Sequence, residues 1–271
     1  MIRWLALAAA LLLASCGPRE TVATPAVWRL SDGDTEIWLL GTIHALPAGV
    51  HWQTPAVAAA IAGADTLVTE IPAGDAATFE AAARVLGLPP LAQRVAAAQR
   101  AALARYGTTL DDMKTWAAAV TIAAAPMQQA GASAEDGVDA TLAARFAGRR
   151  HLALETQAGQ LALFDSLPEP AQRVLLARAI GDPDGYARTL AAWSAGDMRA
   201  LAASLEPAFR GTPVLQEVLV TRRNARWSGW IAQRMRRPGR VLVAVGAGHL
   251  VGADSVVAML GKRGFTVTRI G

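Results

Sequence analysis

The chain has 271 residues, of which 53% are apolar, and this is enough for one domain with a large hydrophobic core. Its formal net charge of +4 comes almost entirely from scattered arginines, because Lys114 and Lys262 are the only lysines. Since no long block of like charges occurs, we expect no nucleic-acid partner. Cys16 is the only cysteine, which excludes an internal disulfide.

The amino-terminal residues have the pattern of a bacterial export signal. Arg3 supplies a positive charge, and residues 4–13 form an apolar run that is too short to span a bilayer comfortably. Residues 13–16, Leu-Ala-Ser-Cys, resemble the lipobox of bacterial lipoproteins, where cleavage before the cysteine leaves a lipid-bearing amino terminus. An ordinary signal peptide followed by a chance cysteine is the alternative.

We therefore predict a lipoprotein signal peptide at residues 1–15 and several acyl chains, such as palmitate, on Cys16. This lipid would make the membrane a partner of the protein, and Gly17 is compatible with an anchor in the outer membrane of a bacterial cell envelope, facing the periplasm. Residues 16–26 are prolines, threonines and small residues without a period, and they predict a tether. Residues 27–271 then form a single domain.

The domain opens with a predicted β-hairpin. Two short apolar runs, residues 27–30 and 36–40, flank the turn cluster Ser-Asp-Gly-Asp at residues 31–34. The second run leads into Gly-Thr-Ile-His at residues 41–44. Pro55 then begins a predicted helix that extends to about residue 64.

A strand is predicted at residues 66–71, and it carries Glu70 before Pro72 ends it. Residues 75–150 are alanine-rich and predict about four helices, with breaks near residues 87–90, at Gly107 and around residues 126–137. A short apolar run at residues 151–154 follows and predicts another strand, which leads into Glu155 and Thr156.

Residues 170–236 predict a second helical block. The chain closes with an uninterrupted apolar strand at residues 241–245, a helix at about 254–261 and an edge strand at 265–270. Strands that alternate with helices predict an α/β fold. We expect a mostly parallel central sheet covered by helices, with a large helical insertion and an N-terminal β-hairpin.

Four polar residues lie at or just beyond the carboxyl ends of predicted strands: His44, Glu70, Glu155 and His249. Both histidines end a Gly-x-x-His motif. In open α/β sheets ligands bind outside these strand ends, so the four side chains could meet in one pocket. Two imidazoles with one or two carboxylates suit a divalent metal that activates water, and an oxygen-rich set favours manganese over zinc.

Other interpretations remain open from the residues alone. A histidine after a glycine turn is often structural or simply exposed. Glu70 interrupts an apolar run and needs a partner, because an unpaired buried carboxylate costs several kcal/mol. That partner is either a metal or an arginine such as Arg223 in a structural ion pair. The glycines at residues 246–252 are spaced somewhat like a phosphate-binding loop, but no βαβ unit follows them.

Together these motifs resemble the TraB/GumN family, which is related to the Tiki proteases. The resemblance extends over residues 27–270 and rests on six segments: Trp38–His44, Thr69–Ile71, Gly137–Asp139, Leu154–Thr156 with Gln160, Arg223–Asn224 and Val245–Gly252. It implies that the paired Gly-x-x-His motifs and a glutamate surround a metal-dependent hydrolytic centre.

Carried over to this sequence, the resemblance implies a divalent metal (Mn, Co or Zn) at His44, Glu70 and His249, and a catalytic group that comprises Glu70, Glu155, Arg223 and Asn224. Activated water would attack a peptide or another envelope substrate with a similar carbonyl, with Glu70 or Glu155 as general base. A non-catalytic cell-surface binding protein for a peptide, haem or glycan is the alternative function. A buried structural polar cluster is the third interpretation.

Overall fold

The computed structural model describes residues 20–72 and 74–271 of the chain. The signal peptide predicted at residues 1–15 and the lipid site predicted at Cys16 lie outside the described residues. Within the described ranges, no helix is both long enough and apolar enough to cross a bilayer.

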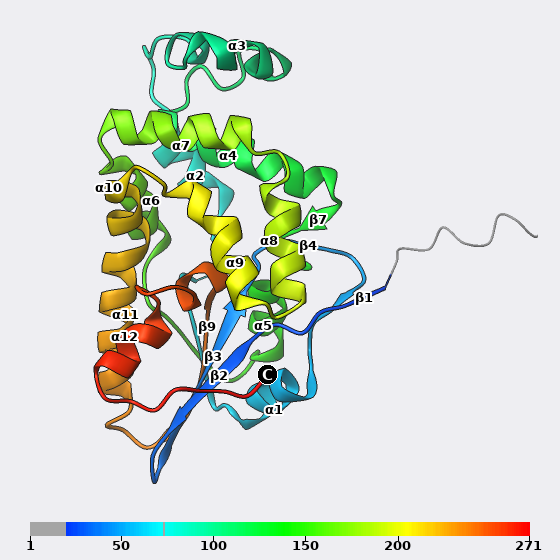
Figure 1. The fold of residues 1–271 in the computed structure, drawn as a ribbon, viewed down its shortest axis with the longest axis vertical. Helices are drawn as coiled ribbons and strands as arrows, with labels where there is room; N and C mark the ends of the chain where they lie inside the picture. The colour runs from blue at the N-terminus through cyan, green and yellow to red at the C-terminus, as the bar shows by residue number, and fades with distance from the viewer. Residues whose placement is uncertain (1–19, 73) are drawn as a thin grey trace, which may run out of the picture.

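A six-stranded sheet with the order β10-β2-β3-β9-β6-β8 forms the centre of the molecule (Figure 1). Its strands are β2 (Val27–Ser31), β3 (Thr35–Thr42), β6 (Thr66–Thr69), β8 (Arg150–Ala153), β9 (Gly239–Gly246) and β10 (Thr268–Arg269). β3, β9, β6 and β8 run parallel, whereas β2 pairs antiparallel with both β3 and β10. The predicted α/β fold with a mostly parallel sheet and an N-terminal hairpin is confirmed.

The late strand β9 inserts between the early strands β3 and β6. Gly246 pairs with Thr42 of β3, and Ala244 pairs with Thr69 of β6. Residues 241–245 are apolar without alternation because both faces of this strand are covered, and each of them is at most 1% exposed. The strand order therefore brings the two ends of the domain together.

Helices cover both faces of the sheet. Leu242 and Ala244 pack toward one group of helices, whereas Val241, Val243 and Val245 pack toward the other. The first group is α1 (Pro55–Gly63), α5 (Val138–Arg145), α8 (Gly185–Ser194) and α9 (Met198–Leu205). The second group is α11 (Arg222–Arg234) and α12 (Val256–Lys262).

The predicted helical insertion forms a second core around Trp116, whose ring stacks on Phe164 with 5.6 Å between centroids. Its helices are α2 (Ala76–Ala83), α3 (Ala97–Leu103), α4 (Thr115–Gln129), α6 (Gln157–Asp165) and α7 (Glu169–Gly181). The break expected around residues 126–137 falls within that range, because α4 ends at Gln129, three residues after Pro126, and the next helix begins at Val138.

Short elements complete the chain: α10 (Pro213–Gln216), the 3₁₀ turns η1 (Leu91–Gln93), η2 (Ala104–Tyr106), η3 (Glu206–Ala208) and η5 (Ala247–Leu250), and the π-helical η4 (Glu217–Thr221). Two strand pairs lie outside the main sheet, β1 (Thr21–Val22) with β5 (Val50–His51) and β4 (Leu46–Pro47) with β7 (Ala132–Ser133).

The segment at residues 20–26, which the sequence assigns to a tether, packs on the domain instead. β1 pairs with β5, the Ala23 N–H donates to the His51 carbonyl at 2.8 Å, and Ala23 and Ala26 are buried. Small residues without a period give no sequence signal for such packing, although they fit closely against a strand. The folded body therefore begins earlier than the predicted boundary at residue 26.

Candidate functional site

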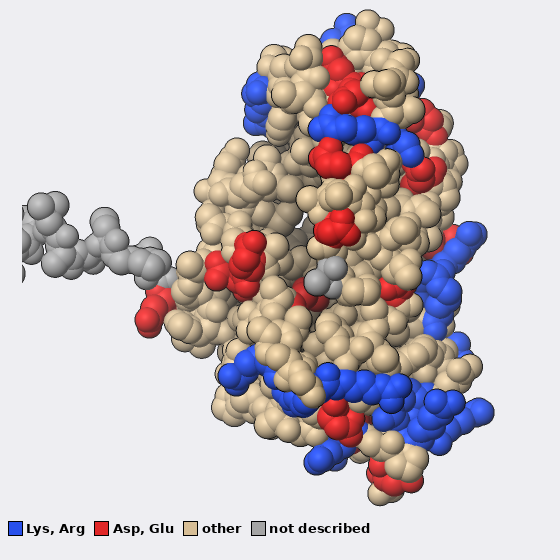
Figure 2. All heavy atoms as spheres, turned by 180° about the vertical axis from the view of Figure 1, so that it is seen from behind, with Lys and Arg blue, Asp and Glu red and all other residues tan. Residues whose placement is uncertain are grey.

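The carboxyl ends of the parallel strands point toward the helical insertion, as the arrow of β3 shows in Figure 1. His44 follows β3, Glu70 follows β6, Glu155 follows β8, and His249 lies in η5 directly after β9. All four predicted residues therefore lie at one edge of the sheet. Figure 2 shows the molecule hollowed between its helical upper part and its lower part.

Gly246, the last residue of β9, lies where the two histidines and Glu70 meet. A Cβ atom here would stand 3.0 Å from Glu70 Oε1, 3.5 Å from His44 Nε2 and 3.8 Å from His249 Cδ2. The Gly246 N–H also donates to Glu70 Oε1 at 2.6 Å. A glycine at this position therefore leaves a small space that all three side chains border.

The His44 imidazole is oriented by Asp139. His44 Nδ1 lies 2.8 Å from Asp139 Oδ2, and Thr42 Oγ1 donates to the other carboxylate oxygen at 3.2 Å. This contact occupies Nδ1 and leaves Nε2 directed at the space beside Gly246. His44 is set back among the surrounding loops but keeps 65% of its side-chain surface exposed, as expected for the wall of a recess.

Two close approaches hold the His44 loop in place. Gly137, which caps α5, lies so near the His44 carbonyl that a Cβ would overlap it, and the Val138 N–H donates to the Ile43 carbonyl at 3.1 Å. On the other side, Trp193 Nε1 of α8 donates to the Gly41 carbonyl at 2.9 Å. The start of α5 therefore lies against the His44 loop, and this position brings Asp139 into contact with the imidazole.

Asp139 is a site residue that reasoning from single residues missed. The sequence singles out residues 136–139 as a motif, and residues 137–139 as a segment of the family resemblance, but it indicates no partner for the carboxylate. A glycine followed two residues later by an acid at a helix start was the available signal. The partner lies 95 positions away along the chain, and only the fold brings the two together.

Glu70 forms a buried ion pair with Arg223 of α11. Arg223 Nη2 donates to Glu70 Oε2 at 2.7 Å, and Gln160 Nε2 donates to the same oxygen at 3.1 Å. The other edge of the guanidinium binds Glu155, with 3.0 Å from Nε to Oε2. Arg226 also donates to Glu155, at 2.8 Å. Arg223 thus stands between the two carboxylates, and the arginine partner considered for Glu70 from the sequence is present.

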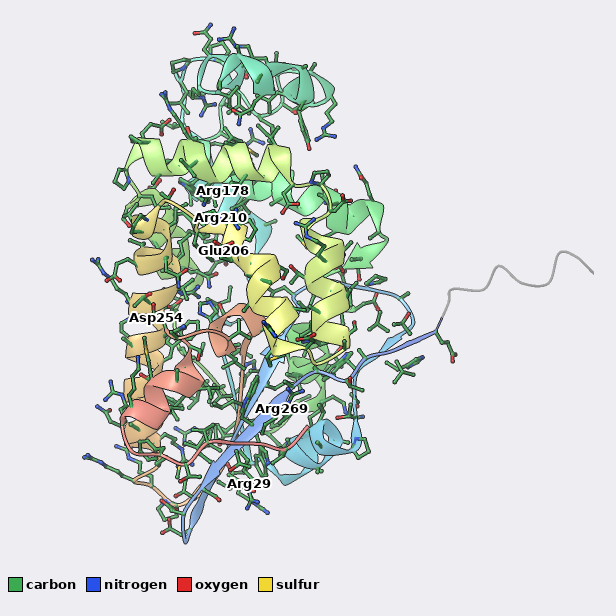
Figure 3. The ribbon with its side chains drawn as sticks, in the orientation of Figure 1. Arg29, Arg178, Glu206, Arg210, Asp254 and Arg269 are labelled. Carbon is green, nitrogen blue, oxygen red and sulfur yellow. The ribbon has the colours of Figure 1, made fainter. Side chains whose placement is uncertain are left out.

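His249 is held as a neutral imidazole by its two partners. Arg223 Nη1 lies 3.1 Å from His249 Nε2, and a guanidinium can only donate, so Nε2 accepts. The proton is therefore on Nδ1, which donates to Asn224 Oδ1 at 2.7 Å. The Asn224 amide is fixed in turn, because its Nδ2 donates to the carbonyl of Asp254, which Figure 3 labels near α11, at 2.8 Å.

The pKa values of the three central groups follow from these contacts. Burial raises the pKa of Glu70, but the charges of His249, His44 and Arg223 and the Gly246 N–H outweigh burial and lower it from 4.5 to about 2. Burial lowers the pKa of His249 from 6.5 to about 4. Since His249 is neutral above that pH, the protonated His44 and the guanidinium of Arg223 are the cations that hold Glu70 ionised near neutral pH.

The pKa of His44 moves in the opposite direction. The surrounding loops partly desolvate the ring and lower its pKa, but the hydrogen bond and the charge of Asp139, together with the charge of Glu70, raise the pKa from 6.5 to about 9. The metal-free site therefore contains one protonated imidazole and one neutral imidazole near neutral pH.

A sequence model of the TraB/PrgY/gumN family matches residues 26–269. The chain belongs to this family. The match covers nearly the whole described domain and includes every strand-end residue of the site, so the resemblance inferred from the motifs is confirmed. No curated protein and no solved structure matched the chain.

In this TraB/PrgY/gumN protein the donor atoms are of the kinds that bind divalent metals. Each imidazole has its Nδ1 fixed by a side-chain oxygen, which is the support that metal-binding histidines have. His249 Nε2 lies 3.8 Å from Glu70 Oε1, and His44 Nε2 borders the same space. Within residues 20–72 and 74–271, however, no three His, Cys, Asp or Glu side chains form a preassembled metal-holding group. Arg223 Nη1 must leave His249 Nε2 before all three donors can coordinate.

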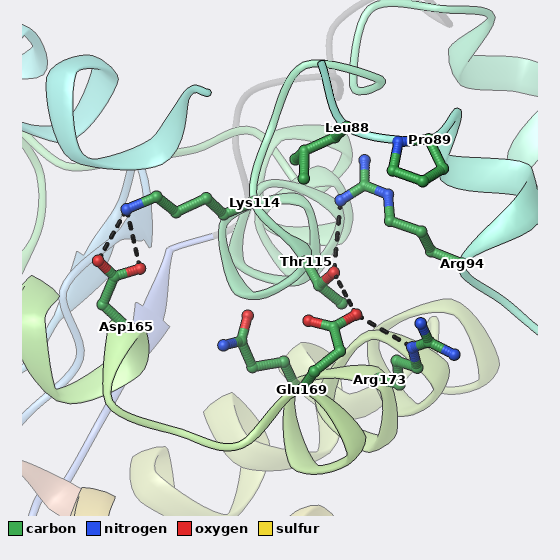
Figure 4. Close-up of a pocket in the computed structure, with 9 residues that line it drawn as sticks. Leu88, Pro89, Arg94, Lys114, Thr115, Asp165, Glu169 and Arg173 are labelled. Atoms are coloured by element: carbon green, nitrogen blue, oxygen red, sulfur yellow. Dashed lines mark hydrogen bonds and ion pairs between the residues drawn. The ribbon is translucent and has the colours of Figure 1, made fainter. Parts of the chain in front are cut away.

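A cavity of about 270 Å³ lies in the helical insertion, away from the strand ends (Figure 4). Lys114 points toward Asp165 there, and Thr115 lies between Arg94 and Glu169. Lys114 is paired with Asp165 and Glu169 with Arg173, whereas Arg94 donates to the Met113 carbonyl and its Nε has no hydrogen-bond partner among the described residues. A second cavity, of about 510 Å³, opens beside the turn between β2 and β3.

The free energy of unfolding of the metal-free protein is expected to be largest near pH 6.5. Between pH 6.5 and 4 the unfolded chain binds more protons than the folded one, because the folded pKa of His249 is about 4, so stability falls with falling pH by roughly 2 to 3 kcal/mol. Between pH 6.5 and 9 the folded chain binds more protons, because the folded pKa of His44 is about 9, so stability falls with rising pH.

Urea unfolding in the presence of a chelator, from pH 4 to pH 9, measures this profile. Replacing His249 by glutamine should flatten the acid side, and Asp139→Asn should flatten the alkaline side. A wild-type profile that keeps rising from pH 6.5 to 9 would contradict the protonation state assigned to His44.

Proposed function

We propose that this protein is a metal-dependent, protease-like hydrolase that cleaves a peptide or similar carbonyl substrate at the cell envelope, where the lipid predicted on Cys16 anchors it. One observation supports the proposal above all. His44 directs Nε2 toward the space that Gly246 leaves beside Glu70, the His249 ring borders the same space with Cδ2 and has Nε2 3.8 Å from Glu70 Oε1, and each imidazole has its Nδ1 bound by a separate side chain. A purely structural cluster would not need one imidazole that is 65% exposed.

The residues of the site have distinct roles in this proposal. A divalent metal bound by His44, Glu70 and His249 would supply Lewis-acid polarisation and lower the pKa of a water molecule. Asp139 and Asn224 hold the imidazoles in the required orientation. Glu70 is ionised over the whole physiological pH range, so it can bind a cation or accept a proton.

Glu155 is better suited to orienting Arg223 than to acting as general base. Its carboxylate is 9% exposed and receives hydrogen bonds from Arg223 and Arg226. The guanidinium of Arg223 separates it from Glu70 and from the recess. Of the two bases considered from the sequence, we therefore propose Glu70.

Metal content tests the proposal directly. The mature protein, purified in detergent with its native amino terminus, is analysed by mass spectrometry for bound metal and screened against peptide libraries with and without chelator. We expect about one divalent metal per chain and cleavage that stops on chelation. Equal metal content in wild type and in the double variant His44→Ala/His249→Ala would rule the metal centre out. Peptide binding without cleavage, unchanged by chelator, would favour the non-catalytic binding protein.

Gly246→Ala is expected to abolish metal binding and cleavage while the protein stays folded. Gly246 has φ −49°, which alanine adopts without strain, but the new Cβ would occupy the space between Glu70 Oε1 and His44 Nε2. Gly248→Ala is the matched control in the same loop, because its Cβ meets only the end of the Leu205 side chain. If Gly246→Ala retains as much metal as Gly248→Ala, the space beside Gly246 is not the binding position.

A further inference from the structure

We propose that Arg223 is an internal cation of the site, which competes with the metal for His249 Nε2 and Glu70 and thereby determines which metals enter. The inference rests on the proposed function, because it concerns how the same three ligands are made available. It differs from a general catalytic role for Arg223, since it predicts that removing the arginine strengthens metal binding.

The contacts of Arg223 show that its guanidinium already fills the place of a cation. Nη2 binds Glu70 Oε2 at 2.7 Å, and Nη1 binds His249 Nε2 at 3.1 Å. These are two of the three proposed metal-binding side chains, and both face the guanidinium within the buried part of the site. The nitrogen lone pair that a metal needs on His249 is therefore engaged.

Arg223 is anchored by groups outside the proposed metal shell. Its Nε donates to Glu155, Nη1 also donates to the Leu219 carbonyl at 3.1 Å, and the guanidinium lies over the Trp227 ring at 4.6 Å. Glu155 is held in turn by Arg226. The hydrogen bond to His249 can therefore break while Arg223 stays bound to Glu155, so that exchange with a metal needs a shift of one guanidinium edge and no unfolding.

The positive charge of Arg223 opposes the binding of a metal cation. A divalent cation beside Glu70 would stand next to a guanidinium that is only 7% exposed, and repulsion between buried like charges is screened much less than in water. Only a metal that gains enough from the imidazole nitrogens overcomes both this repulsion and the lost hydrogen bond.

This requirement separates classes of metal. Zinc binds imidazole nitrogen strongly, whereas magnesium prefers oxygen ligands, keeps much of its water and gains little from His44 or His249. Arg223 should therefore exclude magnesium from a site whose single carboxylate would otherwise attract it. Without the guanidinium, Glu70 and Glu155 together would present two carboxylates to any divalent cation.

Calorimetric titration of the metal-free mature protein with Zn²⁺ alone and with Mg²⁺ alone tests the proposal. In Arg223→Met we expect the Zn²⁺ affinity to rise about 10- to 100-fold, the effect of removing one competing charge-assisted hydrogen bond, and Mg²⁺ binding to become measurable. Arg226→Met is the matched control, because Arg226 also binds Glu155 but is 54% exposed and contacts no proposed metal ligand. It should leave both affinities unchanged.

Zn²⁺ affinity that is unchanged or weaker in folded Arg223→Met would overturn the proposal and leave the metal centre standing. If neither the wild type nor the variant binds Zn²⁺, both this inference and the proposed function are wrong. If Arg223→Met does not fold, imidazole ¹⁵N shifts of the wild type decide. We expect His249 to bear its proton on Nδ1 without metal, and Nε2 to pass from Arg223 to the metal at one equivalent of Zn²⁺. An Arg223–His249 hydrogen bond that persists at saturating Zn²⁺ would overturn the inference.

Discussion

Replacing Glu70 by glutamine is expected to lower the free energy of unfolding by about 3 kcal/mol, because it leaves Arg223 as a buried cation with one carboxylate fewer. Both side chains of this pair are less than 10% exposed, so water cannot replace the missing charge. Glu155 still binds Arg223, which keeps the loss near the lower end of the range for broken buried pairs. The variant should also lose the bound metal. Urea unfolding of the metal-free protein at pH 7 measures the change in the free energy of unfolding without any contribution from bound metal.

Glu217→Gln provides the control for Glu70→Gln. Glu217 pairs with Arg222, one residue before Arg223, but these two side chains are 46% and 64% exposed. Solvent screens this pair, and we expect a loss of less than about 1 kcal/mol. Equal losses in the two variants would mean that Glu70 and Arg223 are not a buried, mutually dependent pair.

Replacing Gly137 by alanine is expected to destabilise the protein by about 3 kcal/mol and to displace His44. The new Cβ would overlap the His44 carbonyl oxygen and stand 2.7 Å from the carbonyl carbon and 2.9 Å from the Ala134 oxygen. These are backbone atoms, so no side-chain rotation relieves the overlap, and either α5 or the His44 loop must move. Loss of the His44–Asp139 hydrogen bond should follow, and the pKa of His44, measured by NMR titration, should fall toward 6.5.

Gly261→Ala should change stability in the opposite direction. Gly261 lies in α12, no atom lies within 4 Å of its added Cβ, and alanine favours a helix over glycine by about 1 kcal/mol. Thermal or urea unfolding of the two glycine variants side by side separates the steric effect from the general effect of the substitution. A stable Gly137→Ala protein with an unshifted His44 would contradict the close approach of α5.

The local pattern of the sequence predicted most of the strands correctly. It also predicted which site residues follow these strands. The apolar run at residues 241–245 and the turn at residues 31–34 report burial and chain reversal within a few neighbouring residues, and such signals are local. They also place His44, Glu70, Glu155 and His249 after strands. The packing of residues 20–26 on the domain could not be predicted from the sequence, because short strand pairs of small residues have no hydrophobic period.

The sequence by itself determined a parallel α/β domain with two Gly-x-x-His motifs at strand ends, because periodicity and glycine spacing are properties of adjacent residues. Only the tertiary structure decided the partners. β9 lies between β3 and β6, so Gly246 comes between His44 and Glu70, and Arg223 reaches Glu70 across 153 positions. The tautomer of His249 and the protonation of His44 follow from these distant contacts. These contacts depend on the order of the strands and on charges that lie close in space but far apart along the chain. Patterns of neighbouring residues therefore cannot reveal them, and the completed fold is needed.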